Sequence, residues 1–465
     1  MTIGRLYTPG LAQVAYVVAD EEAGVAAIID PRRDVEIYRD WAEAHRVRIV
    51  AILETHIHAD FVSGARELAA ATHAPILVSR TGGQAFATDY LDDGDDLPIG
   101  SLHLKVLATP GHTPEHLAYL LFDPAHGSDP VALFSGDALF VGEVGRPDLL
   151  GEDETQHLAT QLYHTVERLK ALPDGLVVYP GHTAGSACGK KIGDAPTTTI
   201  GQEKRGNYAF HATSEHEFVE KVLADMPPSP TYYPVLKRVN KDGAAPLAEL
   251  PPGKALTPAD VANHLIAGSL VVDARTPEAF GAGHIPGAVF AGLGENFTTW
   301  MGWLAPYDRD VALVLDDDDR YDEARTELHR IGVDRVAGFL AGGMRTWAGD
   351  GRRVRTLPQL SVADLAQRRT RSDALAVLDV RGDDEWKAGH IAGAAHRFAG
   401  EIIQGAEPPL SEDQPTAVIC GSGYRASVAA SILEGRGYGS LRNVTGGMEA
   451  WEAAGLPEDN EERDA

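Results

Sequence analysis

Two histidines and an aspartate alternate along one short stretch of the chain. His56, His58 and Asp60 follow residues 48–53, an apolar run with the length and composition of a buried strand. If the chain stays extended past that strand, alternate side chains point to the same side and these three converge. Imidazole and carboxylate groups crowded in this way are ligands for a metal ion. The alternative is a polar turn in which the histidines are incidental.

Three more residues of the metal-binding types follow other apolar runs. His112, Asp137 and His182 each lie in a turn directly after a run of strand length. Four separate strand ends that offer His or Asp are hard to attribute to chance. We therefore expect these side chains to form one functional site.

The elements that must position these side chains alternate strand-length runs with turn clusters and a few helical stretches. This pattern predicts a layered α/β sandwich with polar groups at its strand ends. Residues 226–234, which are rich in proline, predict an extended segment, and residues 244–254 predict a linker. The predicted strands span 14–18, 26–29, 49–53, 76–78, 102–107, 117–122, 131–134 and 176–179, and the predicted helices span 35–45, 63–71, 155–171 and 213–223.

Length and composition limit the class of protein. A chain of 465 residues suits about three domains, and 44% apolar with 23% charged residues is typical of globular protein. The formal charge of −27 argues against nucleic acid and anionic membranes as partners, because their phosphates would repel the chain. We see neither an apolar run long enough to cross a bilayer nor a signal peptide, so we expect a cytoplasmic protein.

The chain has two cysteines, which cannot form a disulfide framework and are therefore candidates for chemistry. Cys188 follows His182 in a loop of small residues, and Lys190 and Lys191 come directly after it. We expect the two ammonium groups to lower the pKa of the thiol and to hold an anionic substrate. Our hypothesis is that Cys188 lies near the metal pocket and holds or relays sulfur. A plain packed thiol is the alternative.

The second half of the chain contains an internal repeat. Residues 271–288 and 377–394 share the pattern Asp-x-Arg followed by Gly-His-Ile-x-Gly-Ala, and residues 342–347 recur at 446–451. Two copies of one domain of about 100 residues account for the repeat. Each copy alternates short strands with helices, which predicts two doubly wound α/β domains.

The two copies differ where chemistry is expected. In the second copy, the predicted strand 416–419 ends in Cys420, and a helical run begins at Ala426. Backbone N–H groups between a strand and a helix favour a thiolate and can hold an added sulfur, and Arg425 adds a positive charge. The first copy has no cysteine there. Its residues 316–319 are four aspartates that would repel an anionic donor, so we expect that domain to be inactive.

The six His and Asp residues make the first half of the chain similar to the metallo-β-lactamase fold. Within that superfamily, residues 145–148 (Gly-Arg-Pro-Asp) and the C-terminal repeat resemble the bacterial persulfide dioxygenase–rhodanese fusions. The resemblance implies one ferrous iron per chain, held by His56, His112 and Asp137 with open positions for dioxygen chemistry.

The same resemblance implies that His58, Asp60 and His182 orient the metal ligands and donate hydrogen bonds to them. Phe61 departs from the two-metal hydrolases such as glyoxalase II, which have a histidine there. Because phenylalanine cannot ligate, we expect one metal rather than two. Spacing alone would also accept zinc.

Cys420 and Arg425 are separated by four residues, a spacing that resembles the rhodanese sulfurtransferase loop. Cysteine phosphatases have five residues there, a larger ring that suits phosphate. The resemblance implies that Cys420 takes up sulfane sulfur as a persulfide and passes it to a nucleophile. The sequence leaves open whether the loop makes or consumes thiosulfate.

These resemblances imply an α/β chain of three domains. An αββα metallo-β-lactamase sandwich spans residues 1–245, a rhodanese-like domain without cysteine spans 255–352, and a catalytic rhodanese domain spans 358–460. The implied substrates are O2 and a low-molecular-weight thiol persulfide of the glutathione or coenzyme A type. The implied product of the oxidation is sulfite, and Cys420 would transfer sulfur between sulfite or thiosulfate and a thiol. The resemblance also implies a role in sulfide detoxification and a homo-oligomer. The candidate substrate-binding residues are Arg146, Cys188, Lys190 and Lys191.

Two rival functions stay open. One is a zinc-dependent thioester hydrolase of the glyoxalase II type fused to a rhodanese, against which Phe61 argues. The other is a sulfur-carrying protein in which only Cys420 matters, against which the intact metal set argues.

Overall fold

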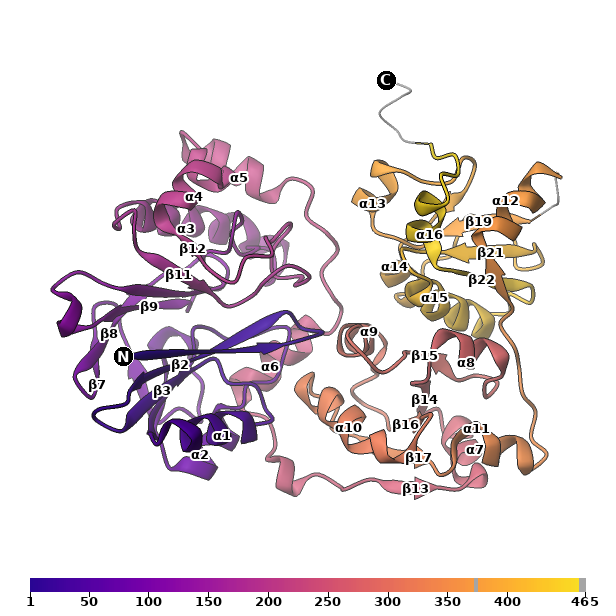
Figure 1. The fold of residues 1–465 in the computed structure, drawn as a ribbon, viewed down its shortest axis with the longest axis horizontal. Helices are drawn as coiled ribbons and strands as arrows, with labels where there is room; N and C mark the ends of the chain where they lie inside the picture. Colours follow the sequence, from indigo (N-terminus) through magenta and orange to yellow (C-terminus); the bar gives the residue numbers. More distant parts are fainter. Residues whose placement is uncertain (372–374, 460–465) are drawn as a thin grey trace. The chain divides into compact units, whose positions relative to one another are not determined.

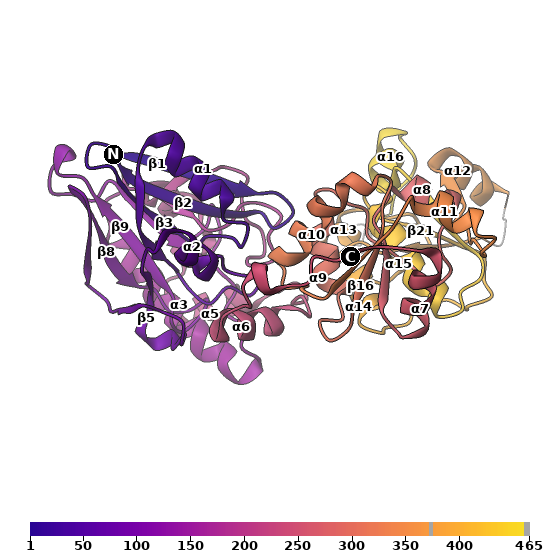
Figure 2. The same ribbon diagram turned by 90° about the horizontal axis from the view of Figure 1, so that it is seen from below.

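The computed structural model describes residues 1–371 and 375–459. It divides the chain into two compact units, the first with residues 1–250 and 329–332 and the second with the rest (Figures 1 and 2). Residues 372–374 and 460 of the predicted third domain lie outside the described residues. In the part of the chain that the structure describes, no helix combines the length and the apolar character that a membrane crossing requires.

Two mixed β-sheets make up the centre of the first unit, and within residues 1–250 each has six strands. In spatial order, the first sheet consists of β1 (Thr2–Thr8), β2 (Gln13–Asp20), β3 (Val25–Ile29), β4 (Arg48–Leu53), β5 (Ile76–Ser79) and β6 (Asp89–Leu91). The second consists of β12 (Thr198–Thr199), β11 (Val177–Pro180), β10 (Ala132–Gly136), β9 (Leu117–Phe122), β8 (Leu102–Ala108) and β7 (Asp96–Ile99).

Strand β2 shows why these sheets form layers. It is buried along its whole length, and its alternate residues enter two different cores. Val14 and Tyr16 belong to the core between the two sheets, whereas Ala15 and Val17 belong to the core under the outer helices. A strand buried on both faces reads as a continuous apolar run, which is why the sequence revealed it.

Helices cover the outer face of each sheet and complete an αββα sandwich. The first sheet is covered by α1 (Glu36–His45) and α2 (Ala65–Thr72), and the second by α3 (Glu152–Lys170) and α5 (Glu215–Leu223). Two shorter helices, α4 (Ile200–Gly206) and α6 (Tyr233–Asp242), follow later in the chain. The predicted sandwich is confirmed, and every strand predicted in this half overlaps an observed one.

The prediction that residues 226–234 are extended was wrong for the last two residues. Helix α6 begins at Tyr233 and has Pro234 in its first turn. Proline is tolerated there, since the first N–H groups of a helix have no intrahelical acceptor.

The second unit contains two sheets of parallel strands, each with five strands among the described residues. The first has the order β13 (Lys254–Leu256), β17 (Val336–Leu340), β16 (Val311–Val314), β14 (Leu270–Asp273) and β15 (Val289–Phe290). The second repeats this order with β18 (Gln359–Ser361), β22 (Leu441–Thr445), β21 (Thr416–Ile419), β19 (Ala376–Asp379) and β20 (Ala395–His396).

Equivalent helices flank both sheets, as the sequence repeat predicted. The first copy has α7 (Pro258–Ile266), α8 (Pro277–Ala282), α9 (Phe297–Leu304), α10 (Tyr321–Arg330) and α11 (Gly343–Gly349). The second copy has α12 (Val362–Thr370), α13 (Asp383–Ala388), α14 (Ala399–Ile403), α15 (Tyr424–Gly435) and α16 (Gly447–Ala453).

The two copies share one hydrophobic core. Phe290, Trp300 and Trp303 of the first copy lie in the same cluster of buried residues as Val418 and Cys420 of the second. The first copy therefore contributes to the packing around the cysteine loop of its neighbour.

Candidate metal centre and cysteine loop

Three of the predicted metal ligands come together at the strand ends of the sandwich. His56 follows β4, His112 follows β8 and Asp137 follows β10 directly. Their potential ligand atoms all lie within 4.8 Å of one another, and all three side chains are buried. The Asp137 Oδ2 atom is 3.8 Å from His56 Nε2 and 3.4 Å from His112 Nε2.

The facing atoms of this cluster lack hydrogen-bond partners. His56 Nε2, His112 Nε2 and Asp137 Oδ2 are buried, and none has a partner among the described residues. Buried polar atoms are normally hydrogen-bonded because leaving them unpaired costs free energy. A cation between the three atoms would satisfy all of them at once. Two imidazoles and one carboxylate therefore fit a single divalent metal ion.

Hydrogen bonds on the far side of each ring fix which nitrogen faces the centre. The Nδ1 atom of His112 lies 2.9 Å from the Arg146 carbonyl oxygen, so it carries the proton and leaves Nε2 as a lone pair. The Nδ1 atom of His56 lies 2.9 Å from Thr55 Oγ1, and that hydroxyl donates to Asp30 Oδ2 at 2.8 Å. Such contacts orient metal ligands.

His182 joins the centre to a second carboxylate. Its Nδ1 atom lies 2.8 Å from Asp137 Oδ1, and its Nε2 atom lies 2.8 Å from Asp60 Oδ2. Burial alone would lower the pKa of His182, but the carboxylates of Asp137 and Asp60 raise it to about 10. Both ring nitrogens are thus occupied within the protein, and the predicted orienting role of His182 and Asp60 fits this geometry.

His58 lies between two carboxylates that sequence reasoning did not assign to the site. Its Nε2 atom is 3.1 Å from Asp30 Oδ1 and 3.3 Å from Glu54 Oε2. Burial opposes the proton on His58, but the charges of Asp30 and Glu54 raise its pKa well above the ordinary value. The signal for Asp30 was present in the sequence, because this aspartate directly follows β3 as Asp137 follows β10.

Phe61 is fully buried, and its ring packs against His58 with 4.3 Å between the ring centroids. An apolar side chain occupies this place, so the loop offers no ligand here.

The Cys188 loop lies beside the centre. Ligand-type atoms of Cys188, Asp60 and His182 lie within 4.8 Å of one another, and the Cys188 sulfur is 3.9 Å from the Tyr233 hydroxyl. The prediction of a lowered thiol pKa was wrong. Burial and the charges of Asp60 and Asp137 raise the pKa of Cys188 well above the ordinary value.

The two lysines of this loop explain the error. The Lys190 ammonium donates to the carbonyl oxygens of Lys221 at 2.7 Å and Ala224 at 3.0 Å, so it serves the end of α5. Lys191 is exposed to solvent. Spacing in the sequence places an ammonium near a thiol along the chain but does not set the direction of either side chain.

Arg146 holds the loop in place. It donates to both carboxylate oxygens of Asp148 at 2.7 Å, to the Pro227 carbonyl at 2.8 Å and to the Ala187 carbonyl at 3.2 Å. Because the guanidinium is buried and engaged by protein groups, the substrate role expected for Arg146 does not fit this geometry.

The second candidate site is the loop between β21 and α15. Cys420 is buried, and its sulfur accepts a hydrogen bond from the Gly423 N–H at 3.1 Å. Gly423 has a φ of +102°, which a residue with a side chain rarely adopts. The loop thus presents the backbone N–H of Gly423 to the sulfur, which agrees in kind with the predicted N–H environment.

Arg425 has a partner that the sequence did not reveal. Its guanidinium donates to the Glu385 carboxylate at 2.6 and 2.7 Å. The charge of Arg425 is therefore balanced by α13 rather than free.

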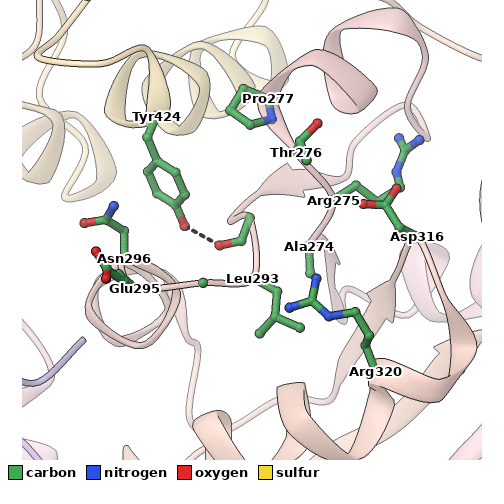
Figure 3. A pocket seen from close by; sticks show the side chains of 12 residues that line it. Ala274, Arg275, Thr276, Pro277, Leu293, Glu295, Asn296, Asp316, Arg320 and Tyr424 are labelled. Atoms are coloured by element: carbon green, nitrogen blue, oxygen red, sulfur yellow. Dashed lines mark hydrogen bonds between the residues drawn. The ribbon is translucent and has the colours of Figure 1, made fainter. Parts of the chain in front are cut away.

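Tyr424 ties this loop to the copy without cysteine. Its hydroxyl donates to the Gly292 carbonyl at 2.8 Å, and both residues line a cavity of about 290 Å³ (Figure 3). Arg275 and Arg320 also line the cavity, and each is paired, with Asp273 and Glu323 respectively. Strand pairing makes Leu315 the equivalent of Cys420, so the first copy has a leucine in place of the thiol, and the aspartates 316–319 follow it in the loop.

Comparison with known proteins identifies the class that this fold and site define. A model of the metallo-beta-lactamase superfamily matches residues 8–182, and a model of the rhodanese-like domain matches residues 257–350 and 361–454. A crystal structure of a metallo-beta-lactamase from Staphylococcus aureus is 35% identical, covers 73% of this chain and 98% of its own, and has a TM-score of 0.66. The chain belongs to the metallo-beta-lactamase superfamily and carries two rhodanese-like domains.

Two curated relatives match the first half of the chain. The persulfide dioxygenase ETHE1 of Bos taurus is 30% identical over 38% of this chain and 66% of its own length. A hydroxyacylglutathione hydrolase of Synechococcus is 34% identical over 36% of this chain and 63% of its own length. The chain thus spans about two thirds of the length of each relative. Its first domain is similar both to a persulfide dioxygenase and to a hydroxyacylglutathione hydrolase.

Proposed function

We propose that the protein is an iron-dependent persulfide dioxygenase coupled to a sulfurtransferase. The observation that carries this proposal is the set of three facing ligand atoms, two from imidazoles and one from a carboxylate, that have no hydrogen-bond partner among the described residues. This donor set with open positions suits ferrous iron. The homology to persulfide dioxygenases supports the choice, and the same donor set would also hold zinc.

The proposed first reaction is R–S–SH + O2 + H2O → R–SH + SO3²⁻ + 2 H⁺, with glutathione or coenzyme A as the type of carrier thiol. Iron, when bound by His56, His112 and Asp137, would supply a site where dioxygen and sulfur react. The Arg146 carbonyl keeps the Nε2 atom of His112 free for this role. The Nδ1 atom of His182 contacts Asp137 Oδ1, the oxygen that does not face the two imidazoles, so the carboxylate keeps its position during turnover.

In the proposed second reaction, the Cys420 thiolate first takes the outer sulfur of a second R–S–SH molecule, which leaves as R–SH. The resulting Cys420 persulfide then passes that sulfur to sulfite. The sulfur–sulfur bond of Cys420 breaks, a sulfur–sulfur bond to sulfite forms, and the products are thiosulfate and the Cys420 thiolate. The Gly423 N–H, which already donates to the cysteine sulfur, stabilises the thiolate that leaves. The same steps run backwards from thiosulfate.

The proposal assigns oxidation to residues 1–245 and sulfur transfer to residues 358–460. Residues 255–352 lack the thiol and support the cysteine loop through Tyr424. We propose that the chain works in sulfide detoxification.

A Cys420→Ser variant tests the coupling. The account expects persulfide-dependent oxygen uptake to continue, because the metal ligands are untouched, and sulfite to accumulate in place of thiosulfate. Oxygen uptake by oxygen electrode and ion chromatography of the products measure both. Thiosulfate output at the wild-type rate would contradict the assignment, and so would loss of oxygen uptake in a folded variant.

A further inference from the structure

One face of α6 lies against the metal-binding loop. Tyr233, Lys237 and Asn240 are separated by four and three residues, so they share a face of the helix. The Asn240 amide donates to the carbonyl oxygens of His58 at 2.8 Å and Phe61 at 2.7 Å. At the other end of the face, the Tyr233 hydroxyl lies 3.9 Å from the Cys188 sulfur. Lys237 lies between these two contacts.

The Lys237 ammonium is buried and unpaired. Its Nζ atom has no hydrogen-bond partner among the residues that the structure describes. A buried ammonium without a partner is costly, because water no longer solvates it. Burial lowers the pKa of Lys237, whereas the nearby Glu115 carboxylate favours its charged form.

The Asn240 contacts place this ammonium beside the metal-binding loop, because Lys237 precedes Asn240 by three residues on the same face of α6. The Glu115 carboxylate already has a hydrogen-bond partner, since it accepts from the Ile57 N–H at 2.9 Å. The ammonium thus lies on the face of α6 that packs against the metal-binding loop, and among the described residues it has no hydrogen-bond acceptor.

An anion is the ligand that would complete this arrangement. The chain has a formal charge of −27, so any anionic substrate needs a local cation. Arg146 and Lys190 are engaged by carbonyls and by Asp148. A small sulfur anion would gain a charge-assisted hydrogen bond from Lys237 and would remove the cost of the unpaired charge.

We propose that Lys237 is the anion-binding residue of the metal pocket and pairs with the negatively charged sulfur group of the substrate and with sulfite. The identity of the anion rests on the proposed function, whereas the presence of an anion site rests on the unpaired ammonium. Lys237 is a substrate-binding residue that sequence reasoning missed. The sequence predicted an extended segment up to residue 234, so helix α6, which carries Lys237, was not expected.

Sulfite binding to the full-length, metal-loaded protein tests this inference. Lys237→Met keeps the length and the apolar stem of the side chain but removes the ammonium. We expect the dissociation constant for sulfite, measured by calorimetry at fixed ionic strength, to rise roughly ten- to a hundredfold. Because the unpaired buried charge is gone, the thermal midpoint of the unliganded first unit should stay the same or rise.

Lys241→Met is the matched control, since it removes the same charge from an exposed position of the same helix. It should leave sulfite binding within about twofold of wild type, because exposed charges are screened. Unchanged sulfite affinity in Lys237→Met would overturn the inference. Weaker binding together with a lower thermal midpoint would also overturn it, because lost packing would then be the cause.

The same samples separate this inference from the proposed function. If the wild-type protein takes up no oxygen with a persulfide, the proposed function fails. Lys237 would still be required for sulfite binding if the anion site exists.

Discussion

At the scale of single residues, the buried histidines around the candidate metal centre are paired with carboxylates. His182 is held between Asp60 and Asp137, and His58 is held between Asp30 and Glu54. Each imidazole is flanked by carboxylates, so the region around the centre carries balanced charges rather than a bare cluster of acids. Only sites that are balanced in this way can be buried at tolerable cost.

The pair of Arg425 and Glu385 makes the cysteine loop sensitive to acid. Burial opposes the charge of Glu385, but Arg425 outweighs it and holds the pKa of this carboxyl below its usual value. A lowered pKa in the folded state means stability that is present above the ordinary glutamate pKa. That stability is lost as the pH falls through the lowered value.

We therefore predict that Glu385→Gln weakens the pH dependence of the second unit between pH 7 and pH 3. At pH 7 the variant should be less stable by about 1 kcal/mol or less, because the side chain is 43% exposed and solvent screens the pair. Urea unfolding at both pH values measures this.

Glu401→Gln is the control for this measurement, since Glu401 pairs with Arg397 at a longer 3.3 Å. If Glu385→Gln and wild type lose the same stability on acidification, the pair does not have this role.

At the scale of elements, helix α15 links the cysteine loop to the neighbouring copy. Tyr424 begins the helix and donates to Gly292, and Ser431 further along accepts a hydrogen bond from the Phe290 N–H at 3.0 Å. Near its end, Glu434 pairs with His284 at 2.9 Å. The helix that follows Cys420 is thus fixed along one side by the domain without cysteine.

We predict that Tyr424→Phe lowers the stability of the second unit by about 1 kcal/mol, the usual worth of one hydrogen bond. Because the loop is then held less firmly, kcat/KM for sulfur transfer from thiosulfate should fall by up to about fivefold. Tyr438→Phe is the matched control, since that hydroxyl bonds Glu407 at 3.1 Å on another part of the domain. An equal loss of sulfur transfer in both variants would contradict a role for the Gly292 contact.

The sequence predicted the elements that have a periodic or repeated signal. The buried strands appeared as apolar runs, and the repeat predicted two matching doubly wound α/β domains. In the structure, Thr257 and Ser361 cap equivalent helices of the two copies. Short edge strands such as β6 and β12 carry too few residues for a pattern. Helix α6 was partly missed because Pro234 suggested an extended chain, although proline also suits a first helical turn.

Side-chain direction was the information that the sequence lacked. The types and strand-end positions of His56, His112 and Asp137 were enough to predict that they meet. Arg146 and Lys190 had the right charge for substrate binding, but the structure turns both toward protein carbonyls. Lys237 and Glu385 reach their sites from helices distant in the sequence, so no local motif could indicate them.

At the scale of the whole molecule, the proposed function combines two chemistries of sulfur in one chain. In this proposal the first unit offers a centre for oxidation, and the second offers a thiol that carries sulfur. Sulfite would be the product of the first reaction and the acceptor in the second. Fusion of the two therefore keeps sulfite production matched to its consumption.

The most direct test of the central claim combines metal analysis with oxygen uptake. Protein purified without oxygen should contain about one iron per chain and consume O2 with a glutathione or coenzyme A persulfide. Asp137→Asn should lose both properties by at least tenfold, because an amide replaces the charged ligand. Stoichiometric zinc that supports thioester hydrolysis, with no persulfide-dependent oxygen uptake, would contradict the account.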